Sequence, residues 1–226
     1  MSVLRDEAVI GNIRINVRFS EPRFCSSSVI DARVIETDLL FMSSEEDFYN
    51  ALFEGDVSAL ERLSAAKPDL PWAPDETGRD VLVTAIQWSN EASIKWVLSK
   101  NPDVSFVDDC GFSILKHVLQ IEFDESANIV HKRTQDELTQ LTVRLIDLLV
   151  EAGADIELTS TLGESVLHTA AMWSSPTVIR HLLNLGADPM LFDDEYTPRQ
   201  PIYYAKFFKR WDAHKVLEDA MNSQAL

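Results

Sequence analysis

The sequence repeats itself at a period of 33 residues, and this spacing constrains the fold more than any other feature. The segments DETGRDVLVTAI and DDCGFSILKHVL align so that Gly78 and Gly111 stand 33 residues apart. A third copy, TSTLGESVLHTAA, places Gly163 another 52 residues on, which is one period plus 19 residues. The segment DDEYTP at 193–198 opens a fourth copy. A period of this length predicts a solenoid of stacked supersecondary units.

Two amphipathic stretches follow each opening, such as NEASIKWVLSK in one copy and SPTVIRHLLNLG in another. Apolar residues at helical spacing predict a pair of short helices in each copy. Such a pair cannot bury its apolar stripe alone, so neighbouring copies must stack. The 19 extra residues fall near 120–140, where they either lengthen both helices of that copy or form a projecting loop.

The third copy resembles the ankyrin repeat, whose pattern of about 33 residues opens with G-x-T-P-L-H-x-A-A and closes with G-A-D. The matching residues are Gly163, Ser165, Leu167, His168, Ala170, Ala171, Leu182, Leu183, Gly186, Ala187 and Asp188. The other copies are degenerate, with Val83 and Lys116 in place of the histidine. The resemblance implies a mainly α fold, an ankyrin-type helical solenoid of four to five degenerate repeats over about residues 45–220.

The first 44 residues differ from the rest of the chain. The segment IRINVRF at 13–19 alternates apolar and polar residues, which is the pattern of a half-buried strand. A second segment, SSVIDARVIETDLLFM, follows turn-forming residues. We therefore expect two parts: a β-containing segment at 1–44, with a β-hairpin or small sheet on the first repeat, and a solenoid at 45–226 with an insertion near 120–140.

No pattern of catalytic or ligand-binding residues stands out. Asp155, Ser165 and His168 are the residue types of a catalytic triad, but GESVL is not the G-x-S-x-G turn of a hydrolase. The resemblance assigns His168 a hydrogen-bonding role at the start of a helix, and Ser165 the role of a helix cap. The sequence has no zinc-ligand spacing and no glycine-rich phosphate loop. We expect a protein that is not an enzyme and that has no cofactor and no metal.

The chain is strongly acidic, with 37 Asp and Glu residues against 20 Lys and Arg, a formal net charge of −17. This charge repels nucleic acid and anionic membrane surfaces and speeds the encounter with basic proteins. No apolar run reaches the length that spans a bilayer, and the two cysteines suggest no disulfide framework. We expect a cytoplasmic protein with a basic protein partner.

Large apolar side chains occupy the positions that, in ankyrin folds, face the groove where partners often bind. These are Phe53, Trp88, Ile121, Met172, Trp173, Phe207 and Phe208. Buried aromatic anchors carry much of the free energy of protein association, so this stripe is a candidate partner-binding surface. The alternative is that the insertion or the N-terminal strands cover the groove and make these side chains part of the core.

Carboxylates recur at the openings of successive copies, where they would form an acidic rim beside the aromatic stripe. They are Asp75, Glu76, Asp108, Asp109, Glu164, Asp193, Asp194 and Glu195. Part of this rim caps turns, and the rest would attract a basic partner.

Together these patterns predict a non-enzymatic protein-binding module. A small, acidic, single-purpose binder is similar to bacterial immunity proteins, which implies a stoichiometric inhibitor of a basic toxin, such as a nuclease domain. One alternative is an ankyrin adaptor or effector that binds a eukaryotic host or regulatory protein. A second alternative is that the solenoid is the targeting arm of an enzyme that the sequence does not reveal, although residues 1–44 contain no histidine and one cysteine.

Overall fold

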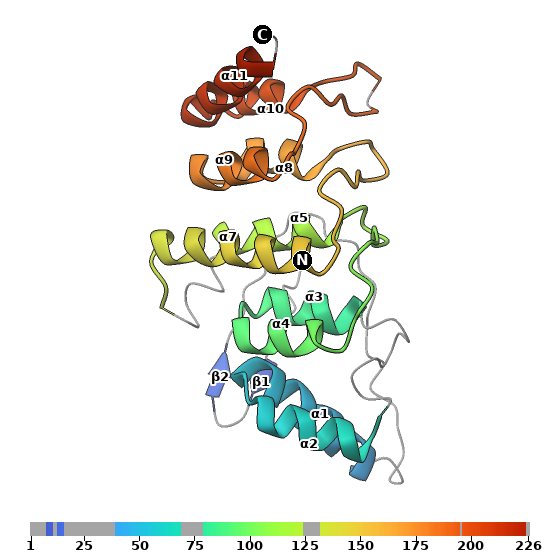
Figure 1. Cartoon of the computed structure of the whole chain (residues 1–226). Coiled ribbons are helices and arrows are strands. Elements are labelled where there is room, and N and C mark those ends of the chain that lie inside the picture. Colours follow the sequence, from blue (N-terminus) through green and yellow to red (C-terminus); the bar gives the residue numbers. More distant parts are fainter. Residues whose placement is uncertain are drawn as a thin grey trace, which may run out of the picture.

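The computed structural model describes residues 8–10, 13–15, 39–68, 79–123, 132–194 and 196–224. Its helices succeed one another as pairs along an elongated stack (Figure 1). The pairs are α1 Leu39–Glu54 with α2 Val57–Ala66, α3 Arg79–Gln87 with α4 Glu91–Leu98, α5 Ile114–Leu119 with α7 Gln135–Glu151, α8 Val166–Trp173 with α9 Pro176–Asn184, and α10 Pro201–Phe207 with α11 Trp211–Gln224. The predicted mainly α fold is confirmed.

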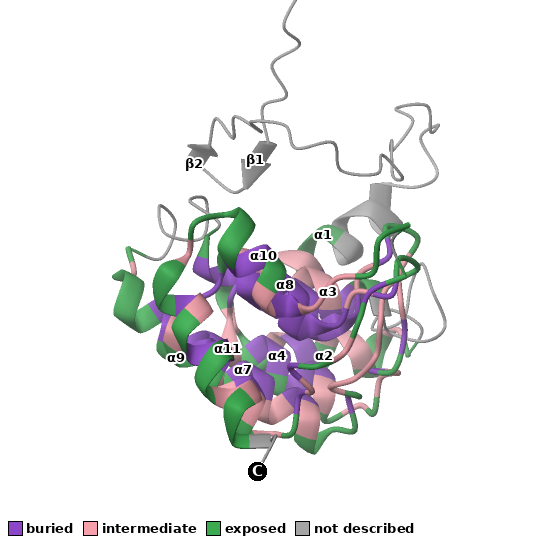
Figure 2. Cartoon of the chain, turned by 90° about the horizontal axis from the view of Figure 1, so that it is seen from above, coloured by how far each residue is buried: buried purple, intermediate pink, exposed green. Residues whose placement is uncertain are grey.

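Two layers of helices enclose the core. The first helices of successive pairs contact one another, as α3 does α5 and α5 does α8, while α4, α7, α9 and α11 form the second layer. Viewed down the stack, the buried residues lie where the two layers face each other (Figure 2). One apolar cluster runs through the stack from Phe48 in α1 to Leu217 in α11. Each pair therefore buries its apolar faces against its neighbours, as a repeat architecture requires.

Side chains that precede two of the second helices, α4 and α11, also tie their pairs to the preceding ones. Asn90 precedes α4, and its Nδ2 donates to the carbonyl of Phe53 over 2.9 Å. Arg210 precedes α11, and its guanidinium donates to the carbonyls of Met172 (3.0 Å) and Ser174 (2.6 Å). These donors satisfy carbonyls that the end of a helix leaves without a partner.

The insertion lengthens one helix rather than both. Helix α7 has 17 residues, against 8 in α4 and 9 in α9, whereas α5 has only 6 and continues as the short 3₁₀ helix η2, Gln120–Glu122. Thr134 caps α7: its hydroxyl accepts from the backbone N–H of Glu137, whose carboxylate accepts from the N–H of Thr134. This capping box fixes where the long helix begins.

Two short strands precede the helices, β1 Ala8–Ile10 and β2 Ile13–Ile15, which pair antiparallel. The rest of the predicted strand at 13–19 lies outside the described residues. Residues 39–44, which the sequence assigns to the β-containing segment, belong to α1, so the predicted boundary at residue 44 falls inside a helix. The wider N-terminal sheet, and its contact with the first repeat, stay predictions.

Candidate protein-binding surface

Five exposed aromatic rings form a continuous series of ring contacts on the surface. The ring of Trp173 lies 4.9 Å from that of Phe208 and 6.0 Å from that of Phe123, measured between centroids. Phe207 lies 5.2 Å from Phe208 and stacks on Tyr203 at 6.1 Å. All five side chains are exposed, from 37% for Phe208 to 64% for Phe207. We call these five residues the aromatic cluster.

Three successive helix pairs contribute to the aromatic cluster. Trp173 is the last residue of α8, and Phe123 follows η2 in the preceding pair. Tyr203 and Phe207 lie four residues apart in α10, on one face of the helix, and Phe208 caps its end. The cluster therefore spans neighbouring repeats, as a surface for a protein partner would.

The two tryptophans at equivalent positions have different surroundings. Trp88 is half-buried, with its ring 5.6 Å from Phe53 and 6.1 Å from Tyr49, and it packs against the core. Trp173 is 47% exposed. Phe53 is half-buried as well. The predicted stripe is thus most open at its C-terminal end, in the aromatic cluster.

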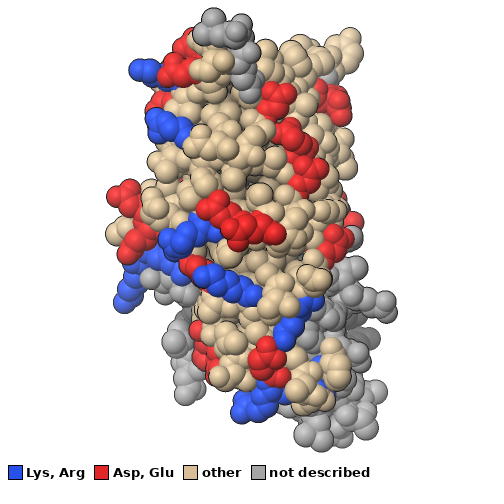
Figure 3. Space-filling model, in the orientation of Figure 1, with Lys and Arg blue, Asp and Glu red and all other residues tan. Residues whose placement is uncertain are grey.

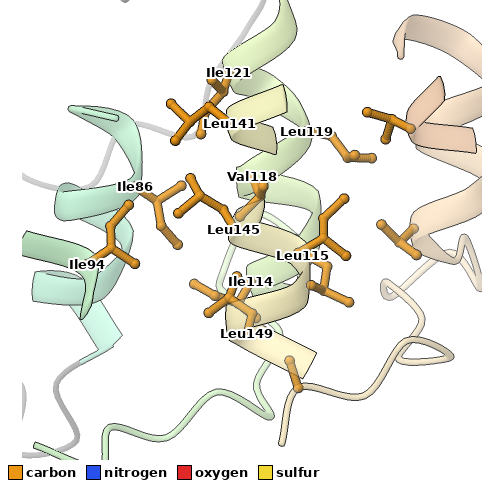
Figure 4. Packing of buried hydrophobic residues seen from close by; sticks show 14 of the residues in the cluster. Ile86, Ile94, Ile114, Leu115, Val118, Leu119, Ile121, Leu141, Leu145 and Leu149 are labelled. Carbon is orange, nitrogen blue, oxygen red and sulfur yellow. The ribbon is translucent and has the colours of Figure 1, made fainter. Parts of the chain in front are cut away.

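Two other residues of the predicted stripe face inward. Ile121 is 3% exposed and lies beside Leu141 of α7 (Figure 4). The prediction of a surface role for Ile121 is wrong, because the lengthened helix α7 covers it. Met172 is half-buried and packs against the core. The backbone carbonyl of Met172 accepts a hydrogen bond from the guanidinium of Arg210.

Several carboxylates of the predicted rim are engaged within the fold. Asp108 accepts from the N–H groups of Cys110 and Phe112, and its Oδ2 lies 2.8 Å from Nε2 of His117. Burial opposes ionisation of Asp108, but the bond to His117 and the backbone bonds outweigh it and lower the pKa of its carboxyl. Glu164 pairs with Lys116 at 3.3 Å. The side chains of Asp108 and Glu164 therefore stabilise the turns in which they lie.

Asp193 is also structural, and a surface role for it is contradicted by its burial at 2% exposure. Its Oδ1 accepts from the N–H of Arg199 over 2.9 Å, and its Oδ2 accepts from the hydroxyl of Tyr204 over 2.6 Å. Burial and this bond raise the pKa of Tyr204. The bonds close the turn that leads into α10.

Asp109 and Asp194 are the rim residues that the structure shows exposed. Asp75, Glu76 and Glu195 lie outside the described residues. Acidic side chains gather along the side of the upper repeats where the turns lie (Figure 3). Lys206 and Lys209, which flank Phe207 and Phe208 in the sequence, are also exposed.

His168 supports the fold at the start of α8. It is fully buried, and its Nε2 donates to the carbonyl of Arg199 over 3.1 Å. Its Nδ1 accepts from the backbone N–H (3.1 Å) and the hydroxyl (2.9 Å) of Ser165. Burial lowers the pKa of His168, which favours the neutral ring that these bonds require. Both ring nitrogens are occupied within the fold, as the family resemblance implies for this position.

Sequence reasoning missed Phe123 and Tyr203. Phe123 lies at the start of the insertion, where the repeat pattern no longer gives a register. Tyr203 could have been found, because it stands one helical turn before Phe207. Across the described part of the chain, no three His, Cys, Asp or Glu side chains are grouped to hold a metal ion. None of the helices described combines the length and hydropathy needed to cross a bilayer.

Comparison with known proteins agrees with the best-preserved copy. A family model described as ankyrin repeat matches residues 162–191, which include α8 and α9. A search among curated proteins returned no match. The matched segment covers one repeat, and the other helix pairs stack on it in the same two-layer arrangement. The chain therefore contains an ankyrin repeat at residues 162–191, which confirms its resemblance to the ankyrin-repeat family.

Proposed function

We propose that the protein is a non-enzymatic binding module that holds a protein partner through the aromatic cluster. The ankyrin repeat suggests a protein–protein interaction module. The observation that carries the proposal is the contact among five exposed rings over three helix pairs. Exposed apolar patches rimmed by polar residues mark interaction sites, and Trp is enriched among the residues that dominate binding.

We further propose a cytoplasmic, immunity-type inhibitor that binds a basic toxin or nuclease domain stoichiometrically. The formal charge of −17 and the exposed Asp109 and Asp194 support a basic partner, since opposite charge raises the association rate. The engagement of Asp108, Glu164 and Asp193 within the fold leaves a smaller rim than the sequence predicts. In this proposal the residues before α1 form a separate N-terminal part, and the binding solenoid includes all of α1, which starts before the boundary predicted at residue 44.

The test is comparative capture of partners from the native host. Wild-type protein is compared with Trp173→Ala combined with Phe208→Ala, and Phe192→Ala is the matched control because its side chain is 55% exposed and has no ring contact in the aromatic cluster. The double variant should lose the partner or bind it at least about thirtyfold more weakly, since such anchors contribute about 2 kcal/mol or more. The Phe192 variant should bind as the wild type does.

Helical circular dichroism of the double variant should match the wild type, because both side chains are exposed. Retention of every wild-type partner by the folded double variant would exclude the aromatic cluster as the binding surface. The partner's charge is tested separately. The association rate should fall as ionic strength rises, and a rate that ignores salt would remove the basic-partner part of the proposal.

A further inference from the structure

The insertion begins with a buried carboxylate that bridges three segments of the fold. Glu122 is 4% exposed. Its Oε1 accepts from the hydroxyl of Thr139 in α7 over 2.8 Å, and its Oε2 accepts from the backbone N–H of Ser175 over 3.1 Å. Its carbonyl accepts from Nε2 of Gln135 over 3.0 Å. One carboxylate oxygen of Glu122 therefore accepts from α7, and the other accepts from the residue before α9.

The position of Ser175 suits an anion. Ser175 caps the start of α9, and its hydroxyl accepts from the N–H of Val178. The N-terminus of a helix carries a partial positive charge, which favours a carboxylate beside it. Glu122 therefore fixes the end of η2 against the following repeat, much as Asn90 and Arg210 tie other pairs together.

The residue held by this arrangement is the next one, Phe123. Its backbone N–H donates to the carbonyl of Gln120 over 3.1 Å, which closes η2. Its side chain is 43% exposed, and its ring lies 6.0 Å from that of Trp173, which Ser175 follows by two residues. The Glu122–Ser175 bond therefore joins the two chain segments that carry Phe123 and Trp173.

We propose that Glu122 is a positioning residue of the binding surface, which holds Phe123 against Trp173, and that the insertion thereby supplies one wall of the aromatic cluster. The inference rests on the proposed function for its biological meaning, but the geometry can be tested without a partner. An apolar residue at 122 would leave the Ser175 N–H and the Thr139 hydroxyl without acceptors in a buried place. Phe123 would then lose its fixed position.

The experiment is NMR of the full chain labelled with ¹⁵N. The chain has five Trp indole N–H signals, and Trp173→Phe assigns the one that matters. Glu122→Gln should shift the Trp173 indole signal and speed exchange of the Ser175 amide about tenfold or more, because a hydrogen bond to a charged acceptor is lost or weakened. Thr139→Val should shift the Trp173 signal in the same direction and by less, since it removes one donor and keeps the shape.

The control separates an effect through Phe123 from general loosening. In a Phe123→Ala background, Glu122→Gln should no longer move the Trp173 signal. Asp109→Asn, a change at an exposed carboxylate, should leave it in place in the wild-type background. A Trp173 signal that ignores both Glu122→Gln and Thr139→Val, or that still moves in the Phe123→Ala background, would overturn the assignment.

Binding gives the second readout. Phe123→Ala should raise the dissociation constant about tenfold for the partner that the Trp173→Ala/Phe208→Ala variant loses, and the further change Glu122→Gln should add little to it. An unchanged dissociation constant in Phe123→Ala would remove Phe123 from the binding surface. Because the NMR measurements use no partner, failure of the proposed function and failure of the positioning role give different results.

Discussion

Lys116 stands where the best-preserved repeat has His168, and its ammonium group is buried beside the carboxylates of Glu164 and Asp108. The side chain is 1% exposed, and Nζ lies 3.3 Å from Oε2 of Glu164, whose side chain is 23% exposed. The ring of Phe112 lies 5.9 Å from the same nitrogen. Burial lowers the pKa of Lys116, and the attraction of Glu164 and Asp108 opposes this shift without cancelling it. The cost of removing the ammonium from water therefore exceeds what the ion pair returns.

We predict opposite signs for two substitutions in this pair. Lys116→Met should be neutral or stabilise the fold, because it removes the buried ammonium and leaves a carboxylate, Glu164, that is partly exposed to water. Glu164→Gln should destabilise it, by less than the roughly 3–5 kcal/mol of a fully buried pair because Glu164 is partly exposed. The double variant should be about as stable as Lys116→Met alone. Urea unfolding at pH 7, followed by circular dichroism, measures all three free energies.

The pH dependence provides a second check on the same reasoning. Because the pKa of Lys116 is lower in the folded state, the unfolded state binds more protons between that lowered pKa and the ordinary lysine pKa of 10.5. Stability contributed by this residue should therefore rise with pH across that window. Lys116→Met should abolish the rise. A loss of more than about 1 kcal/mol in Lys116→Met at pH 7, or no loss in Glu164→Gln, would refute this account.

Two further predictions concern the best-preserved repeat. Gly163→Ala should destabilise the fold more than Gly153→Ala. Both glycines have a positive φ, +74° at Gly163 and +102° at Gly153. A Cβ added at Gly163 would lie 2.5 Å from the backbone nitrogen of Asp194, whereas a Cβ added at Gly153 would meet nothing within 4 Å. Equal losses of unfolding free energy in the two variants would argue against a close approach of the turns. His168 has a pKa lowered by burial, so its contribution to stability should be complete above about pH 6.5 and fall as pH drops below it. His168→Gln should flatten that part of the stability curve in urea titrations from pH 4 to 8, and an unchanged curve would contradict a buried neutral ring.

The fold was predictable where sequence pattern and local geometry coincide. Gly163 takes a positive φ and His168 forms the strut that the repeat pattern implies, because both roles depend on neighbours at fixed separations. The repeat pattern wrongly predicted that Ile121 and Asp193 lie at the surface. Their burial is decided by α7 and by Tyr204, which the repeat period alone does not place.

The aromatic cluster was predictable in part. The repeat register brought Trp173, Phe207 and Phe208 together, but it gave Trp88 the same weight as Trp173. The rings of Tyr49 and Phe53 pack against Trp88, so the difference comes from contacts between repeats rather than from position within one. Phe123 could not be found by register because the insertion starts there.

The bonds from Asn90 and Arg210 to the carbonyls of the preceding pair bear on how the chain unfolds. Because of each such bond, the folding of one helix pair depends on the folding of the neighbouring pair. Coupling of this kind between nearest neighbours makes the unfolding of a repeat protein cooperative. Among the described residues, the pair α10–α11 contacts α8 and α9. Under mechanical or denaturant stress we therefore expect loss of order in α11 to spread to α8 through Arg210, and Arg210→Ala to uncouple the two.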